Sequence, residues 1–247
     1  MQIYYDSEYV DELTERIYKQ FMEGSQNRTR VHMSDLGYCH MKTWSRLSGL
    51  KPFPFNNRSV GIMMIGVVGQ EIIQNVYPEE WSEWELDDPP SHVDVYVQEE
   101  EKFPLEVKFS RKAVYRGDDL SHTWMSQATG YMAKLNEPLG RFAILNIMNG
   151  SLNAFRIEME LEELEARRNK ITEDEALIYK SVAERNPFLL EIDVSQCKYC
   201  DYRDTRGRVK KELGRGCPRY KGRTTANLDQ FLPSSSPVED QPVDKSA

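Results

Sequence analysis

The stretch that decides the fold is a short run of alternating residues, Leu105-Glu106-Val107-Lys108-Phe109. Side chains alternate along a β-strand, so Glu106 and Lys108 face one side while their apolar neighbours face the other. A preceding strand-like run carries a lone acid, Asp94, between two valines. Two acids on adjacent strands can hold a divalent cation together with a backbone carbonyl and water, and a lysine beside the cation can position or deprotonate the attacking water. A salt bridge on an amphipathic strand gives the same short pattern, so this stretch alone leaves both interpretations open.

The residues on either side of this stretch predict an α/β fold. Apolar residues at helical spacing predict a helix at residues 6–23, and a run rich in Ile, Met and Val predicts one at residues 60–76. Further helices are expected at residues 121–135, over the long charged region at residues 158–184, and after a cap at Ser34 or Asp35. Apolar and alternating runs predict strands at residues 81–86, 92–97, 103–109, 142–148 and 152–157. We expect the helix at 60–76 to be buried and to pack closely through Gly61, Gly66 and Gly69. This order of elements predicts a mixed central sheet flanked by helices.

The length of 247 residues suits one domain with appendages. We expect a single domain over residues 1–223 and a disordered tail over residues 224–247, where the composition turns to Ser, Pro and acidic residues. No apolar run is long enough to span a bilayer, and the N-terminus lacks the basic-then-apolar layout of a signal peptide. We therefore expect a cytoplasmic protein without a membrane partner, located in the host cytoplasm if the gene is viral.

The net charge of −8 argues at first against a nucleic-acid partner, but the charge is distributed unevenly. One stretch near the C-terminus is strongly basic and could bind phosphates, because binding depends on the local field rather than on the total charge. A solvated charged loop is the alternative interpretation of this stretch. Its basic residues are Arg203, Arg206, Arg208, Lys210, Lys211, Arg215, Arg219, Lys221 and Arg223.

A second polar pair follows on the helix expected at residues 121–135. Gln127 and Tyr131 are four residues apart and therefore lie on one helix face. An acid, then Glu-x-Lys on the next strand, then Gln-x-x-x-Tyr on a helix resembles the PD-(D/E)xK nuclease superfamily, and within it the RecB-like branch. The resemblance implies a restriction-endonuclease-like fold, and it implies that Gln127 and Tyr131 steady the site and the DNA backbone.

The same resemblance implies roles for the strand residues. Asp94 and Glu106 would be metal ligands for Mg²⁺ or Mn²⁺, Val107 would add its main-chain carbonyl, and Lys108 would lie at the nucleophilic water. The chain departs from the family at Gln70, where RecB-like enzymes usually carry a histidine ligand in a Gly-x-x-x-His pattern. Gln70 could offer its amide oxygen to the metal, or the metal site could be weaker.

The four cysteines lie towards the two ends of the chain. Cys197 and Cys200 form a CxxC pair, Cys217 follows, and Cys39 lies far upstream. Structural disulfides are not expected in a reducing compartment. The layout resembles the CRISPR-associated RecB-like exonuclease family and the AddB-type nuclease domain, in which four cysteines hold an iron–sulfur cluster that joins the termini. The resemblance implies such a cluster here, of the 4Fe-4S type, and zinc is the alternative.

The function expected from these patterns is metal-dependent hydrolysis of DNA, as an exonuclease acting on single strands or DNA ends. The first alternative is a DNA-binding or assembly protein that keeps the nuclease fold but cleaves poorly because of Gln70. A zinc-bound interaction module with an accidental Glu-x-Lys is a third. Other nucleic-acid-processing proteins are possible partners of the chain in each of the first two cases.

Overall fold

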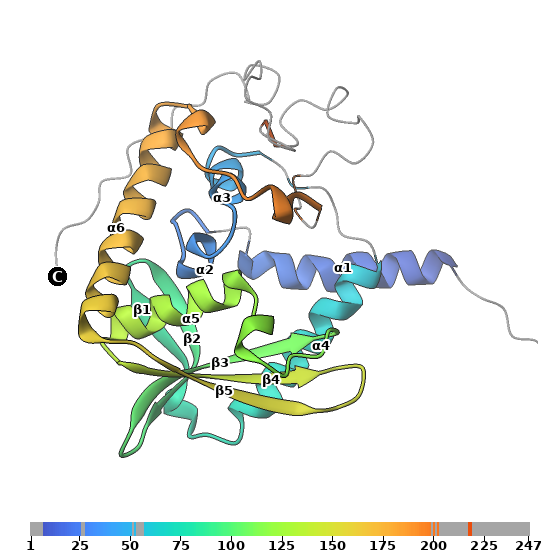
Figure 1. Ribbon diagram of the computed structural model, residues 1–247. Coiled ribbons are helices and arrows are strands. Elements are labelled where there is room, and N and C mark those ends of the chain that lie inside the picture. The colour runs from blue at the N-terminus through green and yellow to red at the C-terminus, as the bar shows by residue number, and fades with distance from the viewer. Residues whose placement is uncertain are drawn as a thin grey trace, which may run out of the picture.

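The computed structural model describes residues 7–25, 28–50, 52, 57–198, 200, 202, 217 and 218. Its centre is a five-stranded sheet in the order β1-β2-β3-β4-β5, with helices packed on both faces (Figure 1). The expected mixed sheet with flanking helices is thus confirmed. The basic stretch at residues 203–223, apart from Cys217 and Pro218, lies outside the described residues, as does the expected tail at residues 224–247.

The strands follow the predicted order with small shifts at their ends. They are β1 (Ser82–Asp87), β2 (Pro90–Gln98), β3 (Lys102–Ser110), β4 (Leu139–Asn146) and β5 (Leu152–Glu158). The first three form an antiparallel meander, β3 and β4 run parallel, and β5 returns antiparallel to β4. The helix α5 (His122–Leu135) connects the two parallel strands, as a parallel pair requires.

Helices cover the two faces of the sheet unequally. The helix α4 (Asn57–Gln74) packs against β2 and β3, and α1 (Ser7–Ser25) packs against α4. On the other face, α5 lies on β3 and β4 and is itself covered by α6 (Leu161–Ala183). The short helices α2 (Met33–Leu36) and α3 (His40–Leu47) contact α5 and α6 (Figure 1). Short 3-10 helices lie at Glu79–Trp81, Gly117–Asp119, Pro187–Leu189 and Val194–Lys198.

Local signals explain where several elements begin and end. Ser121 caps α5 by accepting a hydrogen bond from the Thr123 backbone N–H at 3.3 Å. The predicted cap of α2 is wrong by two or three residues, because His32 is the N-cap and Asp35 lies inside the first turn. The Asp35 carboxylate accepts from the His32 backbone N–H at 2.9 Å, so the acid still closes that helix end.

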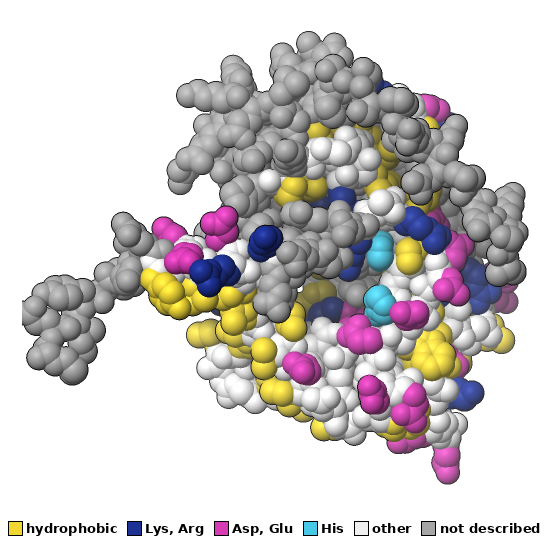
Figure 2. All heavy atoms as spheres, turned by 180° about the vertical axis from the view of Figure 1, so that it is seen from behind, with side chains coloured by type: hydrophobic (Ala, Val, Ile, Leu, Met, Phe, Trp, Pro, Cys, Tyr) yellow, Lys and Arg dark blue, Asp and Glu magenta, His cyan; other side chains and the backbone are white. Residues whose placement is uncertain are grey.

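The expected burial of the helix α4 is wrong for much of its length. Ile65 is 49% exposed, Val68 53% and Ile72 63%. Figure 2 shows a band of exposed apolar side chains on the face of the molecule that it presents. The close packing expected at the glycines holds only at Gly69, where an added Cβ would lie 2.2 Å from the Phe109 ring. The helix thus approaches the sheet closely at one turn, which positions the residue after Gly69.

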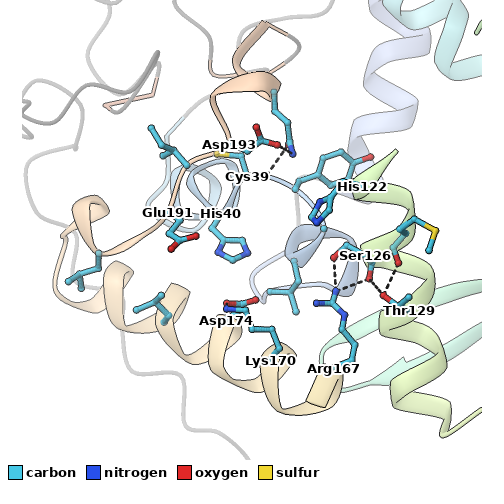
Figure 3. Close-up of a pocket in the computed structure, with 18 residues that line it drawn as sticks. Cys39, His40, His122, Ser126, Thr129, Arg167, Lys170, Asp174, Glu191 and Asp193 are labelled. Atoms are coloured by element: carbon cyan, nitrogen blue, oxygen red, sulfur yellow. Dashed lines mark hydrogen bonds and ion pairs between the residues drawn. The ribbon is translucent and has the colours of Figure 1, made fainter. Parts of the chain in front are cut away.

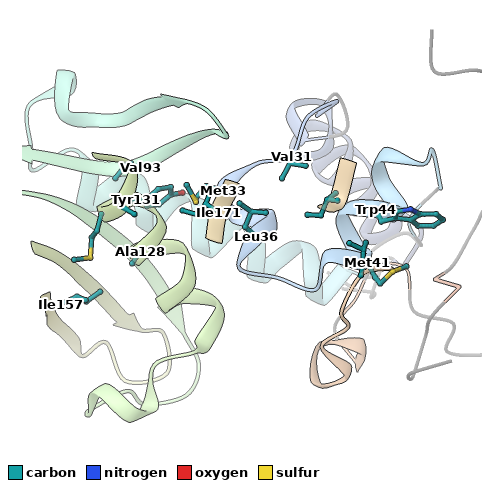
Figure 4. Packing of buried hydrophobic residues seen from close by; sticks show 14 of the residues in the cluster. Val31, Met33, Leu36, Met41, Trp44, Val93, Ala128, Tyr131, Ile157 and Ile171 are labelled. Carbon is teal, nitrogen blue, oxygen red and sulfur yellow. The ribbon is translucent and has the colours of Figure 1, made fainter. Parts of the chain in front are cut away.

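Two hydrophobic clusters fill the space on either side of the sheet. The larger one joins α5 and α6 to the α2–α3 region, and Figure 4 shows Met33 and Ile171 packed near Tyr131 while Trp44 lies at its far end. The smaller cluster lies under α4 and includes Val95 and Val107. Among the helices of the described residues, none combines the length and apolar composition needed to cross a lipid bilayer.

Candidate metal-binding and catalytic site

Asp94 lies where the strands β2 and β3 separate. The antiparallel pairing of these strands ends at Val95 and Leu105, so Asp94 and Glu106 come directly after the last pair. The Asp94 Oδ2 atom accepts a hydrogen bond from the Val107 backbone N–H at 2.7 Å. The carboxylate thus takes a backbone donor between the two strands, and it is 8% exposed. A buried acid held by the backbone in this way has little freedom to move.

Two glutamines of α4 approach Asp94 from above the sheet. The Gln70 Nε2 atom donates to Asp94 Oδ1 at 3.0 Å, and Gln74 Nε2 donates to the Asp94 backbone carbonyl at 2.9 Å. In this orientation Gln70 presents its NH₂ group to Asp94 rather than its oxygen. Gln70 is therefore at the predicted place, but in the structure it acts as a donor and not as an oxygen ligand.

Glu106 and Lys108 lie on the same face of β3, as alternation requires. The Glu106 side chain is 1% exposed, and the Lys108 side chain is 20% exposed. The Lys108 ammonium forms an ion pair with Glu106 Oε1, whereas Glu106 Oε2 has no hydrogen-bond partner among the described residues. A buried carboxylate oxygen without a donor is costly in a protein interior. The site therefore offers an unsatisfied oxygen to a positively charged ligand.

Burial and mutual repulsion dominate the electrostatics of the site. Burial and the Glu106 charge raise the pKa of Asp94, and burial raises the pKa of Glu106. Burial lowers the pKa of Lys108, but the Glu106 and Asp94 carboxylates together outweigh burial and raise it above its ordinary value. Lys108 is thus an ammonium at neutral pH, and it suits the role of a hydrogen-bond donor rather than a base.

Gln127 and Tyr131 are placed beside the carboxylates by α5. The Gln127 Nε2 atom donates to the Tyr131 hydroxyl at 2.8 Å, and the tyrosine is 2% exposed. Burial, and then the Glu106 charge, raise the pKa of Tyr131, which places its hydroxyl within electrostatic reach of that carboxylate. The predicted helix pair and the predicted strand residues therefore meet in one region.

Sequence reasoning missed two residues of the site, Glu83 and Gln74. Glu83 of β1 accepts hydrogen bonds from Gln70 and Gln74, at 2.9 and 2.5 Å, and lies close to Asp94. An acid on an exposed strand gives no signal of its own in the sequence. Gln70 and Gln74, four residues apart on one helix face, are a signal that could have been found.

The cysteines lie at the opposite end of the molecule from the sheet. The Cys39 backbone N–H donates to Gln196 Oε1 at 3.0 Å, which joins the start of α3 to the 3-10 helix that carries Cys197. Cys39 also lines a cavity of about 580 Å³ between α5, α6 and this segment. Figure 3 shows Arg167 and Asp174 of α6 pointing into that cavity.

The expected cysteine cluster is not seen as a set of metal ligands. Across the described part of the chain, which includes all four cysteines, no three His, Cys, Asp or Glu side chains are grouped so that they could hold a metal ion. No disulfide joins any of the four cysteines. Cys217 is buried in the larger hydrophobic cluster, and its backbone N–H donates to the Tyr202 carbonyl at 2.9 Å. Tyr202 is also buried, with 4% of its surface exposed.

Comparison with known proteins assigns no family to this chain. No family model matches it, and no curated protein does. The crystal structure of SSO0001 is a similar solved structure, with a TM-score of 0.49 and 12% sequence identity over 81% of this chain and 96% of that one. A likeness at this level carries no functional assignment.

Proposed function

We propose that this protein is a divalent-metal-dependent DNA nuclease of the RecB-like type, with a restriction-endonuclease-like sheet. The observation that carries the proposal is the pair of buried carboxylates, Asp94 and Glu106, where β2 and β3 separate. Glu106 Oε2 lacks a hydrogen-bond partner among the described residues, and Lys108 pairs with the other oxygen. An ordinary structural salt bridge would explain why Lys108 is paired with Glu106. It would not explain why a second buried acid, Asp94, lies beside this pair without a lysine of its own.

The donor set fits Mg²⁺ or Mn²⁺. Both cations prefer oxygen ligands, and the Asp94 and Glu106 carboxylates with the Val107 main-chain carbonyl would hold one of them. The bound cation would supply a water of lowered pKa and positive charge against the phosphate. Two carboxylates with raised pKa values gain most from such a cation, because it stabilises their ionised forms.

The remaining site residues have roles that follow from their protonation. Lys108, an ammonium, would donate to a phosphate oxygen or to the attacking water, and so stabilise the charge that develops during hydrolysis. Tyr131 stays a neutral phenol because its pKa is raised, and Gln127 holds its hydroxyl in place. This arrangement would steady the DNA backbone beside the carboxylates, as the sequence resemblance implies.

A nuclease assay tests the proposal. The wild-type chain should degrade labelled single-stranded or blunt-ended DNA with Mg²⁺ or Mn²⁺, and activity should stop in EDTA. Lys108→Ala should lower the rate roughly 100-fold or more, as expected when a donor to the transition state is lost. Lys102→Ala removes an exposed lysine at the start of the same strand and should leave the rate unchanged. Full activity in Lys108→Ala would mean that the reaction takes place elsewhere.

One observation favours a second candidate, a DNA-binding protein that cleaves poorly. Gln70 directs an NH₂ group towards Asp94, where a cation would need a ligand oxygen. Gln70→His should raise cleavage if the site is catalytic, because imidazole binds Mn²⁺ better than a neutral amide does, whereas Gln70→Ala should change it little. If the wild type and both variants bind DNA but none cleaves it with either cation, the binding protein is the better assignment.

The cysteine end adds a second part to the proposal, a 4Fe-4S cluster bound by Cys39, Cys197, Cys200 and Cys217. Supporting it, Cys39 is in direct contact with Gln196 beside Cys197. Burial raises the pKa of the Cys39 thiol, and the nearby Cys197 raises it further. Cys39 is therefore a neutral thiol in this structure, and it would lose its proton on binding the cluster, because iron–sulfur clusters are held by thiolates. Zinc at the same residues is the alternative.

A further inference from the structure

A second polar site lies in the cavity between α5 and α6, which includes none of the carboxylates described above. The cavity has a volume of about 580 Å³, a size typical of pockets that bind small molecules. Gln127 and Tyr131 of α5 do not line it, because the cavity is bounded by a different stripe of that helix. The lining residues of α5 are His122, Met125, Ser126 and Thr129. The cavity is thus distinct from the proposed nuclease site.

Arg167 of α6 is a charged group of this cavity that the described chain does not neutralise. Its Nη2 atom donates to the Ser126 carbonyl at 2.8 Å and to Ser126 Oγ at 2.6 Å, which holds the guanidinium in place. The buried Nε atom has no hydrogen-bond partner among the described residues. Asp174, the acid on the same helix face, is paired with Lys170 at 2.7 Å instead. A fixed arginine with unused donors is a binding element for an anion.

The first turn of α5 adds positive potential on the same side of the cavity. This helix is 14 residues long, and its first residue, His122, lines the cavity. The backbone N–H groups at the start of a helix lack partners within the helix and carry a partial positive charge, which favours anions. Figure 3 shows His122 and Arg167 on one side of the cavity, next to Ser126. A side chain and a helix end therefore meet where an anion would bind.

The other side of the cavity has a different character. Glu191 and Asp193 also line the cavity, and Figure 3 shows both away from Arg167. Carboxylates accept hydrogen bonds but repel a second negative charge. Apolar side chains complete much of the lining, namely Leu36, Met125, Leu177, Leu189 and Ile192. This lining fits a ligand with one anionic group, an apolar body, and hydrogen-bond donors at its far end.

We propose that this cavity binds a nucleoside monophosphate unit, with the phosphate on Arg167 and the base against the apolar lining. Phosphate oxygens match the planar fork of a guanidinium. A base has flat apolar faces, and the amino groups of adenine and cytosine donate hydrogen bonds of the kind that Glu191 or Asp193 can accept. The inference goes beyond the proposed nuclease function, and it requires no cation.

Two sources carry this chemistry, a free mononucleotide and the 5′-phosphorylated end of a DNA strand. An internal stretch of DNA fits less well, because it has a phosphate for every nucleotide and would bring further negative charge towards Glu191 and Asp193. The cavity therefore favours a single phosphate at the end of the ligand.

Calorimetric titration of the purified full chain with deoxyadenosine 5′-monophosphate, in EDTA, tests the inference. The nucleotide should bind about tenfold more tightly than deoxyadenosine or more, because the nucleoside lacks the phosphate that pairs with Arg167. Inorganic phosphate, which lacks the base, should also bind more weakly than the nucleotide. These comparisons use the wild-type chain, so they do not depend on the folding of a variant.

Two substitutions on α6 form a matched pair. Arg167→Gln removes the guanidinium but keeps an amide donor, and it should weaken nucleotide binding about tenfold or more. Lys180→Gln removes an exposed positive charge from the same helix, outside the cavity, and should change the Kd less than about twofold. Circular dichroism and Tm establish that both variants fold.

The source of the phosphate is decided with a fluorescent single-stranded oligonucleotide. If the free nucleotide does not bind, the DNA end is the ligand, provided that a 5′-phosphate tightens oligonucleotide binding in the wild type and not in Arg167→Gln. Binding of neither probe would overturn the inference. So would equal binding of the nucleotide and deoxyadenosine, or equal weakening in Arg167→Gln and Lys180→Gln. Because the titrations contain no divalent cation, their failure would leave the proposed nuclease function standing, and the reverse also holds.

Discussion

At the scale of single residues, the site combines charges that oppose one another. Asp94 and Glu106 are both nearly excluded from water, and Lys108 neutralises only one of them. Removing charges from water costs several kcal/mol for each ion unless partners compensate. The folded chain reduces this cost by holding protons on its acids at pH values where they would otherwise be ionised.

This raised proton affinity makes stability depend on pH. The folded pKa values of Asp94 and Glu106 lie above their unfolded values, so their contribution is fully present below about pH 4 and is lost as the pH rises through the folded pKa. In EDTA, the Tm should therefore fall with rising pH more steeply for the wild type than for Asp94→Asn. Thermal denaturation at several pH values between 5 and 8 measures the difference between the two slopes.

Binding of a divalent cation should restore the stability that is lost as the pH rises. At pH 8, Mn²⁺ at about 100 times its Kd should raise the wild-type Tm by roughly 5–10 °C, and by less at pH 5, where protons compete for the carboxylates. Asp94→Asn should gain little from Mn²⁺ at either pH. An equal gain in that variant would show that the stabilising cation binds at another place.

At the scale of elements, α4 aligns the site through one close contact. Gly69 faces the Phe109 ring of β3 without room for a side chain, and the next residue reaches Asp94. Gly66 lies one turn earlier with nothing within 4 Å of the position of a Cβ. The two glycines therefore serve different purposes on the same helix.

The glycines of α4 give a matched pair of substitutions. Gly69→Ala should lower the free energy of unfolding by about 1–3 kcal/mol, because the methyl group would overlap the Phe109 ring. Gly66→Ala should raise it by about 0.5–1 kcal/mol, since alanine restricts the unfolded helix region and meets no obstacle. Urea denaturation of both variants measures this, and stabilisation by Gly69→Ala would contradict the close contact.

The elements also show how far sequence reasoning reaches. Period-two and helical spacing predicted all five strands and the main helices, because those patterns reflect which side of each element is buried. Asp94, Glu106 and Lys108 were predicted because charged residues inside apolar strands are unusual. Glu83 was not predicted, since its contacts depend on a left-handed backbone conformation and on hydrogen bonds from the glutamines of α4. The exposure of α4 was also missed, because apolar composition alone cannot tell a buried helix from one with an uncovered side.

At the scale of the whole molecule, two distant parts of the chain meet at the cysteine end. Cys39 and Gln196 are 157 residues apart in sequence and in contact in the structure. Trp44 reinforces the junction, because its indole N–H donates to the Ser181 carbonyl at 3.1 Å. An iron–sulfur cluster bound here would add a second link between two segments that are already in contact.

The proposed cluster predicts a measurable composition. Anaerobically purified protein should be brown and contain iron and sulfide. The Cys39→Ala variant should contain neither, and its Tm should be several degrees lower, because a cluster that links distant residues restricts the unfolded chain. Gln196→Ala is the control, since it removes the hydrogen bond to Cys39 but keeps all four thiols, and it should retain iron. One equivalent of zinc without iron, after careful anaerobic preparation, would rule out the iron–sulfur cluster.

The spread of the site along the sequence has a consequence for how the chain folds. Every residue proposed at the carboxylates lies between Gln70 and Tyr131, whereas the Cys39–Gln196 contact spans 157 positions. Short loops close with less loss of entropy than long ones. We therefore expect the meander and its two flanking helices to acquire their native contacts during refolding before the long-range closure of the chain. Amide hydrogens around Cys39 would then exchange with solvent through a smaller opening than those of β3.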